Sequence, residues 1–126
     1  MFLVNAFSKK RGSAPDPAPL TSIEFDILLS LADGDRHGYA IKLDIEARAD
    51  GEVVMRPGTL YRAISRLLDG GLIGELDVAP VPEQSDERRR YYTLTSQGNE
   101  AAKLEARRLA RQVSAARSRK LLPRQA

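Results

Sequence analysis

The sequence predicts a mainly α-helical fold with one small β-hairpin, an α+β class in which three helices precede the hairpin and a long helix follows it. Three observations lead to this prediction. Apolar residues recur at helical spacing from residue 23 onward. Two short stretches of roughly alternating character flank a polar, proline-interrupted loop at residues 79–87. No proline interrupts residues 96–122, where alanine, arginine, leucine, glutamate and lysine dominate.

Composition is typical of a soluble globular protein. The 126 residues are 42% hydrophobic and 29% charged, which fits one domain with a modest core. No apolar run approaches the ~20 residues needed to cross a bilayer, so no membrane contact is expected. The absence of cysteine excludes disulfides, thiolate zinc sites and thiol catalysis, and agrees with a cytoplasmic location.

The first part of the chain predicts an extension and two helices. Residues 1–19 contain three prolines within five positions and are expected to form a flexible N-terminal extension. Residues 21–24, Thr-Ser-Ile-Glu, form a capping box, so a first helix should begin there and end at Asp33-Gly34. A second helix is expected over residues 39–47, bounded by glycine-containing turns.

The segment of residues 57–73 is predicted to be a recognition helix. Pro57 suits a helix start, because its missing amide hydrogen would be unpaired there, and Gly70-Gly71 suits the stop. At about 100° per residue, one face of this helix is apolar and the opposite face is polar and largely basic. The polar face holds Thr59, Arg62, Ser65, Arg66 and Asp69, with Tyr61 on its flank and Arg56 just before the helix. Insertion into the major groove needs this arrangement, although an ordinary surface helix with solvated arginines has it too.

Residues 72–78 and 88–95 are the two predicted strands. Arg88, Arg89 and Arg90 open the second strand beside the loop, where side chains can lie along a phosphate backbone. The alternative is a solvated turn that is neutralised by the acidic residues just before it. Tyr92 and Leu94 share the strand face that should pack on the helices, whereas Tyr91 and Thr93 point the other way.

Three helices followed by a hairpin is the order of a winged helix-turn-helix domain, expected here over residues 20–95. The sequence also resembles the PadR family of transcriptional regulators over roughly residues 20–122. Three strings, in the family's order and spacing, carry this resemblance: His37-Gly38-Tyr39-Ala40-Ile41, Gly58-Thr59-Leu60-Tyr61 with Leu67-Leu68-Asp69-Gly70-Gly71-Leu72-Ile73, and Arg90-Tyr91-Tyr92-Thr93-Leu94-Thr95-Ser96-Gln97-Gly98.

The resemblance implies a cytoplasmic homodimer that regulates transcription, usually as a repressor. Such proteins bind a palindromic operator in double-stranded DNA and are often released by a small molecule. No cofactor is expected, and the sequence does not identify an effector. Phe25 is the best aromatic candidate for lining a dimer cavity, although a phenylalanine in an amphipathic first helix is more often part of the core.

The resemblance also implies where DNA is contacted. Thr59 and Tyr61 become expected phosphate or base contacts, and His37 an expected backbone contact. His37 equally suits a helix start with a local hydrogen bond. Many members have proline where this chain has Arg62, so Arg62 either adds a contact or faces solvent. The complete predicted DNA-binding set is His37, Tyr39, Arg56, Gly58, Thr59, Tyr61, Arg62, Arg66, Arg88, Arg89 and Arg90.

Residues 96–126 are expected to form a C-terminal dimerisation helix and tail. Five residues recur at spacings of four and three, as in a heptad seam: Ala102, Ala106, Leu109, Val113 and Ala116. A helix docked only on its own domain is the alternative, and the resemblance favours dimerisation. This segment carries eight basic and two acidic residues, which would widen an electrostatic footprint or help to bind an anionic effector.

Two other functions compete with DNA binding. An enzyme is not expected, because the chain has one histidine, no glycine-rich phosphate loop and no carboxylate pair placed around a cleft. A winged-helix module that binds another protein is the stronger alternative, since the middle of the chain is acidic. Arginines on both the recognition helix and the hairpin favour DNA.

Overall fold

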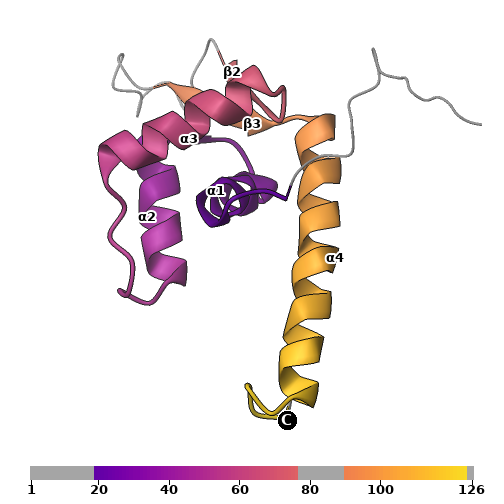
Figure 1. Cartoon of the computed structure of the whole chain (residues 1–126). Coiled ribbons are helices and arrows are strands. Elements are labelled where there is room, and N and C mark those ends of the chain that lie inside the picture. Colours follow the sequence, from indigo (N-terminus) through magenta and orange to yellow (C-terminus); the bar gives the residue numbers. More distant parts are fainter. Residues whose placement is uncertain (1–18, 77–89, 125–126) are drawn as a thin grey trace, which may run out of the picture.

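The computed structural model describes residues 19–76 and 90–124. The predicted extension, up to residue 18, and the hairpin loop with Arg88 and Arg89 lie outside these residues. Seven elements follow one another (Figure 1): α1 (Ser22–Ala32), β1 (Arg36–His37), α2 (Gly38–Arg48), α3 (Pro57–Asp69), β2 (Ile73–Leu76), β3 (Tyr91–Leu94) and α4 (Ser96–Ser118). The predicted α+β class and the order of the four helices are confirmed.

The start of α1 is the predicted capping box. The Thr21 hydroxyl accepts a hydrogen bond from the Glu24 amide at 3.2 Å, and the Glu24 carboxylate accepts one from the Thr21 amide at 2.9 Å. Two of the amides that a helix start leaves unpaired are therefore satisfied. The reciprocal bonds fix the direction in which the chain enters α1.

The predicted extent of the recognition helix was too long by four residues. Helix α3 ends at Asp69, and Ile73 is the first residue of β2. Gly71 adopts φ +77°, and the Leu72 amide donates to the Leu67 carbonyl at 3.0 Å. This Schellman ending satisfies carbonyls of the last turn and reverses the chain, as the glycine pair predicted.

Within the described residues the sheet has three strands in the order β1-β3-β2, where the sequence predicted two. Both neighbours of β3 run antiparallel to it, with His37 opposite Tyr91 and Ile73 opposite Leu94. A two-residue strand carries no alternating pattern, so β1 could not be read from the sequence. Leu72, Arg90 and Thr95 were predicted to lie in the strands but fall just outside β2 and β3, and residues 77, 78, 88 and 89 of the predicted strands lie outside the described residues.

Helix α1 lies at the centre of the core and contacts α2, α3, α4 and β3. In the described residues the buried cluster draws on five elements, among them Leu28 of α1, Ile41 of α2, Leu60 of α3 and Ile73 of β2. Tyr92 belongs to this cluster and Leu94 packs against it, as predicted. None of the helices in the described ranges is both long and apolar enough to span a bilayer.

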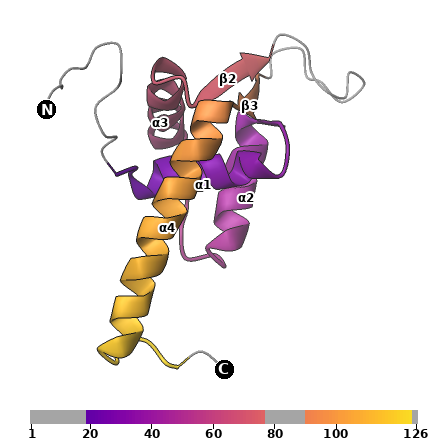
Figure 2. The same cartoon turned by 90° about the vertical axis from the view of Figure 1, so that its right-hand side faces the viewer.

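Helix α4 packs on α1 with its first half and continues past the rest of the domain in both views (Figures 1 and 2). It ends at Ser118 rather than near Leu122, because Lys120 adopts the left-handed φ of +65°. The Leu121 amide donates to the Ala116 carbonyl at 2.8 Å, which closes this end as a second Schellman motif.

Candidate nucleic-acid interface

The outward side of α3 is a polar and basic surface, which we call the reading face: Thr59, Arg62, Ser65 and Arg66, all exposed. The opposite side is buried through Leu60, Ala63, Ile64 and Leu67. The division of this helix into a packed face and a polar face is therefore confirmed. Figure 1 shows that α3 lies on the outside of the domain, at the end where the sheet lies.

The first turn of α3 is open to a ligand. Its N-cap is Arg56, whose side chain makes no capping hydrogen bond, and Pro57 follows at the first helical position. Amides at an uncapped helix start carry partial positive charge and bind phosphate oxygens well. Gly58 and the exposed Arg56 therefore lie at a place where a phosphate can approach the backbone closely.

Arg62 lies across this same turn. Its Nη2 donates to the Thr59 hydroxyl at 3.5 Å, a long hydrogen bond. A Cβ atom built on Gly58 would lie 3.3 Å from Nη1 of Arg62. The guanidinium is thus held loosely beside the open helix start, where it is exposed and has no carboxylate partner among the described residues.

Tyr61 joins α3 to the start of α2. Its side chain lies so close to Gly38 that a Cβ atom there would be 2.9 Å from Cζ of the tyrosine. Gly38 is buried, whereas Tyr61 keeps 47% of its surface exposed. The strings around residues 37–41 and 58–61 therefore meet in space, because only glycine leaves room for the tyrosine.

His37 caps α2. Its Nδ1 accepts a hydrogen bond from the Ala40 amide at 3.1 Å, which is the local role that the sequence left open. The imidazole also packs edge-to-face on Tyr91, with ring centroids 5.3 Å apart. Next along the chain, Tyr39 is half exposed and has Lys42 Nζ 5.7 Å from the centre of its ring. DNA contacts by His37 and Tyr39 stay predictions.

Arg66 is tied to Glu24 of the capping box. Its Nε donates to the Glu24 carboxylate at 2.9 Å, and the glutamate side chain is only 14% exposed. Burial favours the neutral form of Glu24, but the Thr21 amide and the Arg66 side chain outweigh it and hold its pKa below the ordinary value. Sequence reasoning missed this pair, because no short-range signal joins residues so far apart in the chain.

We expect Glu24→Gln to lower the melting temperature at pH 7, because Arg66 then loses its charged partner. Since the folded pKa is depressed, this stabilisation is complete above the unfolded value of about 4.3 and is lost as the pH falls through the folded pKa. Thermal melts at pH 7 and near pH 3 should show a difference from the parent protein that is smaller in acid.

Glu100→Gln is the matched control for this prediction. It removes the same charge from a glutamate that is two-thirds exposed and lies 3.4 Å from Lys103. Exposed pairs of this kind contribute little to stability. An equal loss of melting temperature for Glu24→Gln at pH 7 and pH 3 would contradict the role of its ionised form.

The described part of the hairpin contributes one cation. Arg90 is 70% exposed and lies 3.2 Å from the Glu75 carboxylate of the neighbouring strand. Its charge is therefore partly neutralised by a carboxylate of β2, whereas the acidic residues just before the three arginines lie outside the described residues. Arg88 and Arg89 lie outside the described residues, so their place in an interface stays a prediction.

The predicted seam on α4 divides into two parts. Ala102 packs against the core of its own domain. Ala106 and Val113 are exposed, and Leu109 and Ala116 are half-buried, although the second half of α4 extends beyond the domain. The upper end of the seam thus serves the fold, and pairing of two copies through the lower end stays a prediction.

Three helices, a short strand and a hairpin, with the exposed α3 beside the hairpin, define a winged helix-turn-helix protein. The chain belongs to the Transcriptional regulator PadR-like family, whose sequence model matches residues 27–104. The resemblance seen in the three strings is thereby confirmed. Members of this family are regulators of transcription, which supports the expectation that the chain is not an enzyme.

Individual proteins resemble the chain in sequence. A Streptomyces fradiae protein, described as an uncharacterized 37.1 kDa protein in transposon TN4556, is 39% identical over 85 residues. The match covers 68% of this chain and 22% of that protein. The chain therefore spans about a fifth of the length of this relative.

Solved structures show the same fold. A transcriptional regulator from Clostridium thermocellum has a TM-score of 0.66 at 27% identity, covering 76% of this chain and 87% of its own. A PadR family regulator from Clostridium difficile has a TM-score of 0.65 at 26% identity, covering 78% and 97%. PadR of Bacillus subtilis, solved in complex with operator DNA, has a TM-score of 0.55 at 21% identity, covering 65% and 45%, and shows the fold alone.

Proposed function

We propose that this chain is a DNA-binding transcriptional regulator that inserts α3 into the major groove. The observation that carries the proposal is the open first turn of α3, where an uncapped helix start, Gly58 and the exposed Arg62 lie together. Backbone amides and Arg56 would hold a phosphate, while Thr59 and Arg62 would reach base edges. The operator complex of the Bacillus subtilis protein supports this use of the fold.

The proposal includes a homodimer that acts as a repressor in the cytoplasm on a palindromic operator. Two copies would pair through the strip formed by Leu109, Val113 and Ala116, which the domain itself covers only in part. Such pairing would place two copies of α3 about 34 Å apart, one turn of DNA. A small molecule that changes this spacing would release the operator.

A gel-shift series with the DNA flanking the chain's own gene tests the proposal. We expect a sequence-selective complex whose affinity falls about a thousandfold between roughly 50 and 200 mM salt, because each phosphate contact releases counterions. Binding of a protein partner with no salt-sensitive, sequence-selective DNA complex would overturn it. That result would favour the protein-interaction module. The observation in favour of that module is that two cations of the surface are already paired, Arg66 with Glu24 and Arg90 with Glu75.

Replacing Arg62 by alanine is expected to weaken the specific complex by about 1–3 kcal/mol if the guanidinium reads a base, with a loss of preference at that base pair. If it contacts phosphate, affinity should fall uniformly on all sequences and the salt slope should decrease by about one per subunit. Fluorescence anisotropy on specific and random duplexes separates the two results.

Arg111→Ala is the matched control, because it removes the same side chain from an exposed position on α4. Its affinity for both duplexes should stay within about twofold of the parent value. Unchanged binding by Arg62→Ala as well would show that Arg62 merely faces solvent.

A further inference from the structure

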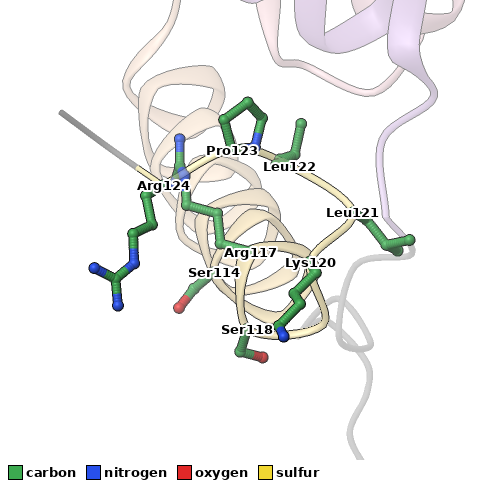
Figure 3. Close-up of a pocket in the computed structure, with 8 residues that line it drawn as sticks. All are labelled: Ser114, Arg117, Ser118, Lys120, Leu121, Leu122, Pro123 and Arg124. Atoms are coloured by element: carbon green, nitrogen blue, oxygen red, sulfur yellow. The ribbon is translucent and has the colours of Figure 1, made fainter.

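The far end of α4 forms an open hollow of about 870 Å³, which we call the C-terminal hollow. The chain reverses at Lys120 and returns along the last turns of the helix, so that side chains of helix and tail line one space (Figure 3). Its lining consists of Ser114, Arg117, Ser118, Lys120, Leu121, Leu122, Pro123 and Arg124. Three of these side chains are cationic and two carry hydroxyl groups.

The positive charge here has no counter-charge in the sequence nearby. After Glu105 the chain contains seven basic and no acidic residues. Glu105 itself is buried, forms an ion pair with Arg108 and accepts a hydrogen bond from the Leu20 amide. The Arg108 hydrogen bond outweighs burial and holds the pKa of this carboxyl below its ordinary value, so Glu105 stays ionised within its own pair. The hollow is left with a net positive potential.

Arg117 has an unused donor inside this structure. Its Nε is buried and has no hydrogen-bond acceptor among the described residues. Figure 3 shows that the side chain runs from the helix toward the backbone at Pro123 and Arg124. Leaving a buried N–H donor of a charged group unpaired costs free energy. A ligand that supplies an acceptor to Arg117 Nε would therefore gain binding free energy there.

The C-terminal end of α4 repels an anion less than a helix end with unpaired carbonyl groups would. Carbonyl oxygens at a helix C-terminus carry partial negative charge. Here three carbonyls of the last turn each accept a backbone hydrogen bond, at 2.8–3.1 Å. The donors are the amides of Arg119, Lys120 and Leu121, which bond to the carbonyls of Ala115, Arg117 and Ala116 in that order. The Ser118 hydroxyl also donates to the Ala115 carbonyl. The tail thus covers these carbonyls and presents cations in their place.

We propose that the C-terminal hollow binds a phosphate-bearing ligand. Arg117, Lys120 and Arg124 would supply the charge and the Ser114 hydroxyl a further donor, which matches the several acceptor oxygens of a phosphate group. Helix α4 has 23 residues, so at about 1.5 Å per residue the hollow lies roughly 34 Å from the sheet end of the helix. It is therefore separate from the reading face, and its occupancy does not depend on the proposed function of α3.

The test is a titration of the full chain, labelled with ¹⁵N, with sodium pyrophosphate. We expect the Nε–H resonance of Arg117 and the amides of residues 114–122 and 124 to shift saturably, and sodium chloride at equal ionic strength to leave them unmoved. Lys120→Gln and Arg124→Gln together should weaken the binding at least about tenfold, since each removes a charge-assisted contact. Arg111→Gln, the same charge change outside the hollow, should stay within about twofold.

A second arm distinguishes the source of the phosphate. A short duplex of random sequence replaces pyrophosphate, and saturable shifts at residues 114–124 with the duplex alone would assign the site to the DNA backbone. Shifts with pyrophosphate would assign it to a small phosphorylated molecule. Shifts that chloride reproduces, or that Arg111→Gln weakens as much as the double variant, would overturn the proposal.

Discussion

Alanine at position 98 is expected to lower the free energy of unfolding by about 3 kcal/mol or more. Gly98 is buried in the first turn of α4, directly against the chain between α3 and β2. A Cβ atom there would overlap the Leu72 carbonyl group, at 2.9 Å from its carbon, and would lie 2.8 Å from Cδ1 of Leu94. No rotamer change relieves an overlap with backbone.

The backbone around Leu72 cannot shift at low cost, because both of its polar groups are bonded. Its amide donates to the Leu67 carbonyl at 3.0 Å, and its carbonyl accepts from the Thr95 amide at 3.2 Å. Moving Leu72 would therefore disturb the ending of α3 together with the start of α4. The contact at Gly98 therefore couples the end of α3 to the first turn of α4.

Urea denaturation of the Gly98→Ala and Gly74→Ala variants measures the effect. Gly74 is the control, since a Cβ atom there would make only ordinary contacts at 3.6 and 4.0 Å. Its substitution should change the unfolding free energy by less than about 1 kcal/mol. Equal stability of the two variants would contradict the packing of α4 on Leu72.

Glutamate in place of Leu109 is expected to convert the proposed dimer to monomers and to reduce operator affinity at least a hundredfold. A charge in an apolar helix pair lacks a partner, and an unpaired buried charge opposes association strongly. Operator affinity falls with it, because one α3 per molecule engages only half of a palindromic site. Sedimentation velocity and anisotropy measure the two effects.

Two further variants make this prediction specific. Val113→Glu should give the same result, and Val113 is 39% exposed, so its replacement disturbs the fold of one protomer little. Ala110→Glu adds the same charge at an exposed position outside the seam and should leave the dimer intact. A dimer that survives both seam substitutions would refute pairing through α4.

Local signals in the sequence predicted most of the fold. The capping box at Thr21, Pro57 at a helix start and the glycine pair after Asp69 each act within a few residues, and each is present in the structure. The end of α4 was misplaced because Lys120, which has a side chain, adopts a conformation that usually requires glycine. Strand β1 exists only because β3 lies beside it.

The candidate site was predictable in its helix and less so in its charges. Helical spacing separated Arg62 and Arg66 from the buried face correctly. That Arg66 pairs with Glu24, while Arg62 does not pair with a described carboxylate, depends on how α1 packs across α3. Position along a helix defines a face, but the neighbours of that face come from the tertiary structure.

DNA cleavage by a reagent attached to a single engineered cysteine tests most directly whether α3 enters the major groove. The chain has no cysteine, so Ser65→Cys on the reading face can carry an iron–EDTA reagent without background. We predict cleavage concentrated in two half-sites about one helical turn apart. The same reagent attached through Gln112→Cys, at an exposed position on α4, should give little cleavage. Cleavage that is absent from position 65, or stronger from position 112, would contradict the proposed role of α3.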